Sequence, residues 1–196
     1  MTKTTKATKT TKTTKAKYAA LLRGINVGGN KKVPMAELRQ ILDGLGHEDA
    51  QTYLQSGNAV FTSTTDRTPA ALARDLEDAI EAHFGFRVPC LVLDGAYLRA
   101  VADACPFPAA DLEGKQLHAT FCSEQPAESR FASIDAPAHL PEEYRVGDRV
   151  IYLYAPNGLG RSKLAEALAK PAVVKGLDVT TRNWNTVAKL VELTRD

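Results

Sequence analysis

Glycine, arginine and asparagine are concentrated where the first apolar stretch of the chain ends. The segment from Tyr18 to Asn30 reads YAALLRGINVGGN and contains Arg23, Gly24, Asn26, Gly28 and Gly29. Glycines let consecutive backbone N–H groups turn toward a common point, an arrangement that suits an anion. An arginine beside them adds a full charge and a fork of donors. We therefore expect this loop to bind an anionic group.

Three further motifs offer groups of the same kind. They contribute Ser56 and Asn58 around a turn glycine, then Arg161, Ser162 and Lys163 after NGLG, and finally Arg182 and Asn183 in TRNWNT. The glycine motifs match neither the GxGxxG pattern of dinucleotide-binding folds nor the GxxxxGK[ST] pattern of phosphate loops. The sequence therefore predicts an anion site, and neither NAD nor ATP nor any other cofactor is assigned.

Residues for catalysis or metal binding do not form a recognisable set. None of the four histidines lies in an HExxH motif or in a cluster with cysteine, so we expect no metal site. His118 and Cys122 share one face of a predicted strand, where burial in the sheet is favoured over a nucleophilic pair. No GxSxG elbow is present, and Glu142 and Glu143 are surface candidates only. The catalytic residues, and whether a reaction occurs, are left open.

The net charge of +2 hides a division between the tail and the rest of the chain. Residues 1–17 contain six lysines and no acidic residue. The remainder has 19 basic against 23 acidic residues, a net charge of −4. A Lys/Thr-rich stretch of this kind cannot bury apolar area, and we expect it to be a disordered tail. A solvated extension is favoured for this tail, with a weak polyanion contact as the alternative.

The cysteines and the hydropathy pattern indicate a cytoplasmic protein. The chain has three cysteines, which form no CxxC pair, and such a scattered odd number is typical of reduced thiols. No apolar run approaches a length of about 18 residues, which would mark a candidate membrane helix. The N-terminus also lacks the apolar stretch of a secretory signal. We therefore expect no membrane contact, and the oligomeric state is left open.

Periodicity and turn residues predict the order βαββαβ in the first half of the chain. Strands are expected at 18–25, 51–55, 58–62 and 88–93, with helices between Pro34 and Gly46, between Thr68 and Gly85, and from Asp94 to Ala104. A similar order follows, with strands at 116–123 and 178–181, a hairpin at 144–152, and helices at 127–133, 162–170 and 183–193. The fold class predicted is α+β, with two ferredoxin-like lobes in tandem and a C-terminal helix. The tail then covers 1–17, the first lobe with its linking helix 18–105, a linker 106–115, and the second lobe 116–196.

Alternating chain direction brings distant motifs together in such a fold. The end of the first strand and the turn between the second and third strands lie at one edge, so Arg23 and its loop should meet Ser56 and Asn58. By the same reasoning Lys163 should face Arg182 in the second lobe, where a helix start adds free N–H groups. Each motif also has a structural alternative, because Ser162 and Asn183 are good helix N-caps and glycines are common in plain turns.

Taken in order, these motifs resemble an uncharacterised bacterial family, domain of unknown function 1697. The signature segments are LRGINVGG from Leu22, PM from Pro34, TY from Thr52 with SGN from Ser56, GRSK from Gly160 and TRNWNT from Thr181. The resemblance covers the chain from Tyr18 to about Leu193. It implies a compact, two-lobed α/β protein and no catalytic residues.

Three functions are therefore weighed. The favoured one is binding of a small anionic ligand containing a phosphate or nucleotide, with group transfer or hydrolysis if chemistry occurs. The second is a nucleic-acid-binding module that uses the basic tail and the strand aromatics Tyr18, Tyr53 and Phe61. The third is a non-enzymatic interaction protein in which the arginines and asparagines lock the two lobes together.

Overall fold

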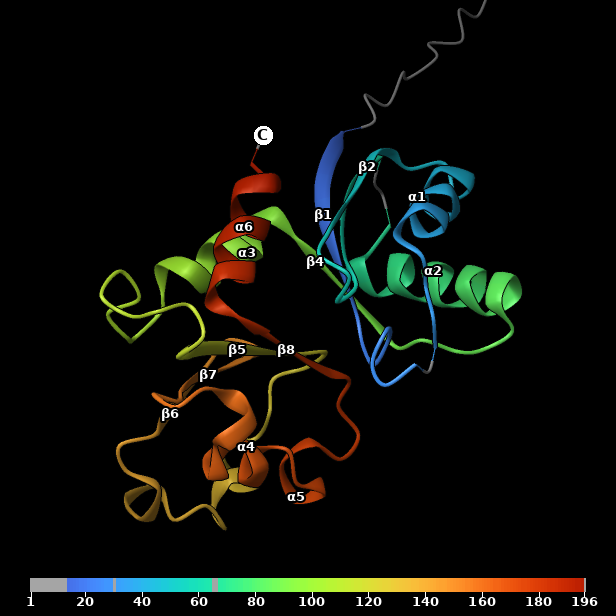
Figure 1. Cartoon of the computed structure of the whole chain (residues 1–196). Coiled ribbons are helices and arrows are strands. Elements are labelled where there is room, and N and C mark those ends of the chain that lie inside the picture. The colour runs from blue at the N-terminus through green and yellow to red at the C-terminus, as the bar shows by residue number, and fades with distance from the viewer. Residues whose placement is uncertain (1–13, 30, 65–66, 196) are drawn as a thin grey trace, which may run out of the picture.

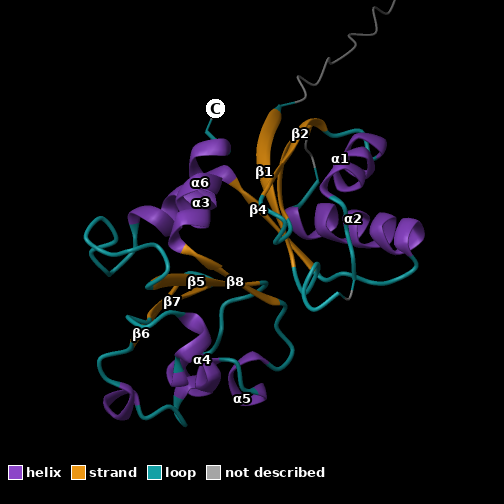
Figure 2. Ribbon diagram, viewed as in Figure 1, coloured by secondary structure: helices purple, strands orange, loops and turns teal. Residues whose placement is uncertain are grey.

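Two four-stranded antiparallel sheets form the framework of this mixed α/β protein (Figures 1 and 2). The structure is a computed structural model that describes residues 14–29, 31–64 and 67–195. Within those residues the chain contains six α-helices and three short 3-10 helices. The sheets are set at an angle to each other, with helices on both sides of each (Figure 2).

The first sheet has the strand order β2-β3-β1-β4. Its strands are β1 (Lys15–Leu22), β2 (Glu48–Tyr53), β3 (Asn58–Thr64) and β4 (Cys90–Asp94). Helices α1 (Met35–Gly44) and α2 (Pro69–Phe84) pack on the outer face of this sheet. The sequence specifies the limits of α2, because the Thr68 hydroxyl accepts a hydrogen bond from the Ala71 N–H and Gly85 ends the helix at φ +76°.

The second sheet repeats this order as β6-β7-β5-β8. Its strands are β5 (Leu117–Cys122), β6 (Glu143–Gly147), β7 (Val150–Tyr154) and β8 (Val179–Asn183). Short segments cover its outer face, namely η1 (Glu128–Phe131), η2 (Ala136–His139), η3 (Leu159–Arg161), α4 (Lys163–Leu168) and α5 (Pro171–Val174). None of these is as long as α1 or α2.

Helices α3 (Gly95–Asp103) and α6 (Trp184–Leu193) lie in the angle between the two sheets (Figure 1). They pack on each other and contribute to one apolar cluster that contains Leu21 of the first sheet and Phe121 of the second. The two halves therefore share a buried core. This core holds the two halves in a fixed orientation. It therefore also fixes how their loops are placed relative to each other on the other side of the junction, away from α3 and α6.

The predicted elements are all present, with differences at their ends. Strand β1 begins at Lys15 and ends at Leu22, so its first three residues come from the stretch assigned to the tail. Of the rest of the predicted tail, residues 1–13 lie outside the described part of the chain. The helix predicted at 127–133 is the 3-10 helix η1. The one predicted at 162–170 ends at Leu168, and Pro171 begins the separate helix α5.

Candidate functional site

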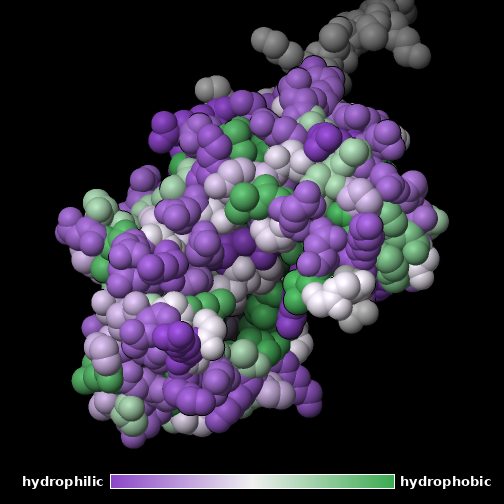
Figure 3. All heavy atoms as spheres, viewed as in Figure 1, coloured by the Kyte–Doolittle hydropathy of each residue, from purple (hydrophilic) through white to green (hydrophobic). Residues whose placement is uncertain are grey.

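A cleft of about 850 Å³ lies where the loops of the first half meet the outer face of the second sheet (Figure 3). The loop after β1 and the β2–β3 turn form one wall. Strands β5, β7 and β8, together with η3, α4 and α5, form the remainder. In the space-filling view, hydrophobic surface is visible in the hollow between the two halves. The cleft is therefore a junction feature that neither half would form alone.

Incomplete helical cover explains why this cleft exists. Helix α4 has six residues and is therefore about 9 Å long. The strands beneath it have five to six residues, and strands of that length span about 17–20 Å. Helix α5 has only four residues. The outer face of the second sheet is consequently left open beside the loops of the first half, and Leu153 and Val179 line the opening.

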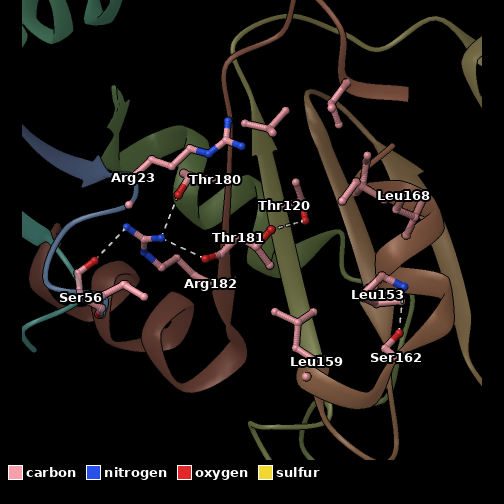
Figure 4. A pocket seen from close by; sticks show the side chains of 18 of the residues that line it. Arg23, Ser56, Thr120, Leu153, Leu159, Ser162, Leu168, Thr180, Thr181 and Arg182 are labelled. Atoms are coloured by element: carbon pink, nitrogen blue, oxygen red, sulfur yellow. Dashed lines mark hydrogen bonds between the residues drawn. The ribbon is translucent and has the colours of Figure 1, made fainter. Parts of the chain in front are cut away.

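Arg182, on β8, reaches from the second half into the first (Figure 4). Its Nε donates to Asn58 Oδ1 at 2.6 Å and one Nη donates to the Leu22 carbonyl at 2.7 Å. The other Nη donates to Thr180 Oγ1 at 2.8 Å and to the Thr181 carbonyl at 3.0 Å. Burial lowers the pKa of Arg182 to about 10, which leaves the guanidinium protonated at neutral pH. The cleft wall thus holds a largely buried cation whose hydrogen-bond acceptors are all uncharged.

Two asparagines hold the wall in place. Asn58 is fully buried, and its Nδ2 donates to the Tyr53 carbonyl and to Ser56 Oγ, both at 3.0 Å. Asn26 links its loop to the β2–β3 turn by donating to the Gln55 carbonyl at 2.8 Å, and it also exchanges two hydrogen bonds with the Val33 backbone. Their amide groups are used within the protein, so these residues shape the wall and are not free donors.

Arg23 differs from Arg182 because its guanidinium is free. It lines the cleft and is exposed, and its backbone N–H is fixed by the Pro89 carbonyl at 2.9 Å. Its side chain makes no hydrogen bond or ion pair with any other residue that the structure describes. Figure 4 shows Arg23 and Arg182 on the same side of the cleft. Two positive charges therefore lie on this side of the cleft.

Most of the opposite side of the cleft is apolar, although Ser162 and Glu166 at α4 also line the cleft. Leu153, Leu159 and Leu168 lie there (Figure 4), and two threonines, Thr120 and Thr181, lie between them and the arginines. The threonine hydroxyls are hydrogen-bonded to each other at 2.8 Å across β5 and β8. The cleft is consequently divided into a cationic end and an aliphatic end.

The start of α4 is already occupied by groups of the protein itself. Ser162 is the N-cap and accepts from the Ala165 N–H at 2.8 Å. Glu142 accepts from the Leu164 N–H at 2.9 Å, and Lys163 is paired with Glu166. The carboxylate of Glu142 thus takes the position in which the sequence predicts a bound anion. The sequence marks Glu142 only as a surface residue, because its role depends on a contact across 22 positions.

The residues predicted for the site fall into three groups. Those that line the cleft are Arg23, Gly24, Asn26, Ser56, Ser162 and Arg182. Asn58 lies directly behind them and holds Arg182. Outside the lining are Gly28, Gly29, Arg161, Lys163 and Asn183. Asn183 is exposed and caps α6 by accepting from the Thr186 N–H at 2.9 Å.

The two motifs of the first half that we expected to be neighbours are in contact. In the second half, Lys163 and Arg182 do not face each other as expected but bind other residues. The loop after β1 contacts the β2–β3 turn through the hydrogen bond from Asn26 to the Gln55 carbonyl. Arg182 binds the first half, and Lys163 binds Glu166. The two sites expected at separate edges are therefore replaced by one cleft, lined by parts of all four motifs. The aliphatic residues of the cleft were missed, because nothing in the sequence distinguishes a core leucine that lines a cleft from one that does not.

His118 and Cys122 do not form a catalytic pair. They are four residues apart on β5, a spacing of about 13 Å along a strand. Both are buried, and burial lowers the pKa of His118 and raises the pKa of Cys122 to about 11, which opposes thiolate formation. No set of three or more metal-ligand side chains converges within the described residues. None of the helices seen there has the length and apolar character to cross a membrane.

A solved structure shares this architecture. The conserved bacterial protein SP0830 from Streptococcus pneumoniae is 25% identical in sequence, with a TM-score of 0.65 over 93% of this chain and 100% of that chain. No curated protein matches the chain. A family model described as a protein of unknown function (DUF1697) matches residues 16–152, which is more than half of the sequence. The chain therefore belongs to the DUF1697 family.

Proposed function

We propose that this protein binds a small anionic ligand in the cleft, with Arg23 and Arg182 supplying the positive charge. The observation that carries the proposal is the guanidinium of Arg182, which is largely buried and has only uncharged acceptors. A buried cation is costly unless an opposite charge offsets it. An anion seated beside the unpaired Arg23 would provide that charge and would gain a charge-assisted hydrogen bond.

The proposal is for binding rather than for catalysis. Among the described residues that line the cleft, Glu166 is the one carboxylate, and it lies 3.2 Å from the ammonium of Lys163. Histidine and cysteine are absent from the described part of that lining. A transfer or hydrolysis reaction at a phosphate would use the two arginines to neutralise developing charge. No residue of the lining is assigned as its general base.

Nucleic-acid binding through the sheet is less well supported. Tyr18 and Phe61 are buried and stack on each other, with ring centroids 5.9 Å apart, beneath α1 and α2. Bases could not reach these rings without unfolding that layer. Tyr53, the third aromatic, is only half-buried, so this one ring and the basic tail would be left for the role, and residues 1–13 of that tail lie outside the described chain.

A purely structural role for Arg182 is the second candidate, and one observation favours it. Its three nitrogens all donate to protein acceptors that come from both halves. Arg23 separates the two candidates because it takes no part in this interaction. If the cleft is only an interface, loss of Arg23 will have no effect on any ligand.

We also propose that the two halves are ferredoxin-like units in tandem. The identical strand orders support this, as do the two helices on one face of the first sheet. In the second half, η1 and η2 follow β5 where α1 follows β1, and α4 and α5 precede β8 where α2 precedes β4. This replacement of long helices by short ones is what opens the cleft.

Thermal denaturation with inorganic pyrophosphate as the probe tests the binding proposal. We expect pyrophosphate to raise the Tm of the wild type by mass action, at an ionic strength matched with sodium chloride. Arg23→Met should lose most of this rise. Arg74→Met is the matched control, because Arg74 is exposed on α2 and does not line the cleft. Equal rises in all three proteins, or none in the wild type, would refute the proposal.

A further inference from the structure

We infer that the ligand of the cleft is an amphipathic aliphatic acid, with a carboxylate or phosphate head and an unbranched hydrocarbon body, rather than a nucleotide. The inference rests on the proposed function, since it assigns the head of the ligand to the arginines. It goes further by assigning the body of the ligand to the opposite end of the cleft.

The polarity of the lining is separated along the cleft. Arg23, Arg182 and Ser56 gather at one side, and the leucines Leu153, Leu159 and Leu168 at the other (Figure 4). Ile151, Val174 and Val179 of the second half also line the cleft, whereas the aliphatic Ile25 and Val27 lie on the same loop as Arg23. A small inorganic anion would fill only the cationic end and leave this aliphatic surface in contact with water. A hydrocarbon chain attached to the anion would bury that surface.

The lining lacks the groups that recognise a nucleotide. No Phe, Tyr, Trp or His lines the cleft among the described residues, so no ring is present there on which a base could stack. The polar side chains away from the arginines are also occupied. Thr120 and Thr181 are bonded to each other, and the Ser162 hydroxyl accepts from the Ala165 N–H. Apart from the exposed amide of Gln55, a ribose or a base edge would therefore find few free partners among the described lining residues.

Exposed aliphatic side chains at the cleft support a hydrocarbon ligand. Val27 is 70% exposed and Leu159 is 38% exposed, and both line the cleft. Val27 lies on the loop after β1, between Gly24 and Gly28, which both have positive φ. Large apolar side chains held in water on a turn gain stability when an apolar group covers them. The volume of about 850 Å³ is within the range of sites for small organic molecules.

Isothermal titration calorimetry with butyrate, hexanoate and octanoate tests the inference, with AMP and pyrophosphate as further probes. Each added methylene should tighten binding by about two- to fourfold. The heat-capacity change of octanoate binding should be more negative than that of butyrate. Leu159→Ser should weaken octanoate binding at least fivefold and leave pyrophosphate binding unchanged. Leu140→Ser is the control, because Leu140 is 66% exposed and lies outside the lining.

The outcomes separate this inference from the proposed function. Pyrophosphate binding that depends on Arg23, together with equal affinities for butyrate and octanoate, would refute the amphipathic ligand and leave the anion site standing. AMP binding tighter than octanoate would likewise refute it. Octanoate binding that is unaffected by Arg23→Met would show that no anionic head is held at the cationic end of the cleft. That result would overturn both the amphipathic ligand and the proposed function.

Discussion

Arg182 Nε and Asn58 Oδ1 lie 2.6 Å apart although 124 residues separate them, and this hydrogen bond joins the two halves of the protein. The same guanidinium binds the Leu22 carbonyl, at the end of β1, one of the two inner strands of the first sheet. Asn58 in turn is held by the β2–β3 turn. The cationic wall of the cleft and the connection between the halves are therefore one structure.

Replacing Arg182 by methionine should destabilise the protein, by about 1–3 kcal/mol for each buried acceptor that is left without a donor. Asn58 Oδ1 and the Leu22 carbonyl would lose a strong donor in a place that water does not readily reach. Urea denaturation measures this change. Arg23→Met is the control, and its side chain is exposed. Surface changes of that kind alter stability by about 0.5 kcal/mol at most. Equal effects of the two variants would show that the connection contributes little.

Gly57→Ala should lower the free energy of unfolding markedly more than Gly29→Ala does. Both glycines have φ +79°. The backbone strain of a non-glycine residue in that region, about 1–2 kcal/mol, is therefore common to both variants. A Cβ at Gly57 would lie 2.8 Å from Ile25 Cδ1 and 2.8 Å from Leu22 Cβ, whereas a Cβ at Gly29 would meet no atom of the described residues within 4 Å. Overpacking of this kind adds about 1–3 kcal/mol.

The difference in stability between the two glycine variants therefore measures the cost of the close contact at Gly57, because the backbone strain is common to both. Measurement of the free energy of unfolding for both variants checks the difference. A Gly57→Ala variant as stable as Gly29→Ala would show that the turn moves freely away from β1.

Most of the fold could be predicted because each element carries local signals. Thr68 and Gly85 mark the two ends of α2, and Asp94 caps α3 by accepting from the Tyr97 N–H. The meeting of Asn26 with the Ser56 turn followed from the alternation of strand direction alone. What could not be predicted is where the two halves join. That depends on the packing of α3 against α6, which no local pattern encodes.

The site was predicted in part for the same reason. Arg23 and Ser56 belong to one half, and topology places them together. Arg182 was expected to face Lys163, but its guanidinium binds Asn58 and the Leu22 carbonyl of the first half instead. The aliphatic side of the cleft was missed because Leu153 and Leu168 have the sequence pattern of ordinary core residues. Their place in the lining results from the shortness of α4 and α5, two helices that meet at a proline.

Glu142→Ala should destabilise the protein, because the Leu164 N–H at the start of α4 would lose its acceptor. Loss of an acceptor at a helix start costs about 0.5–2 kcal/mol. Glu143→Ala is the matched control, because Glu143 is the next residue and forms an exposed ion pair with Arg145, which is worth little. Chemical denaturation of the two variants, in which the same atoms are removed at adjacent positions, gives the difference. Equal losses would mean that Glu142 does not cap α4.

Stability should fall as the pH drops below about 6.5, and His118 should account for part of the loss. Burial lowers its pKa, and its Nδ1 has no partner among the described residues. Between the unfolded value of 6.5 and the lower folded value, the unfolded chain binds the proton and the folded chain does not, so acid favours unfolding. Above pH 6.5 both states are neutral, and this contribution vanishes. The slope from one histidine is at most about 1.4 kcal/mol per pH unit.

Comparison of His118→Leu with the wild type from pH 8 to pH 5 checks this contribution. His47 needs separate treatment, because burial lowers its pKa as well and it contributes with the same sign. The comparison is therefore also made in a His47→Gln background, where His118→Leu should flatten the remaining dependence. At pH 8 the leucine variant should be at least as stable as its parent, because an unpartnered buried nitrogen is removed. If His118→Leu left the pH dependence of the unfolding free energy unchanged in both backgrounds, His118 would be protonated equally in the folded and unfolded states. Local opening of the structure would then relieve its burial easily.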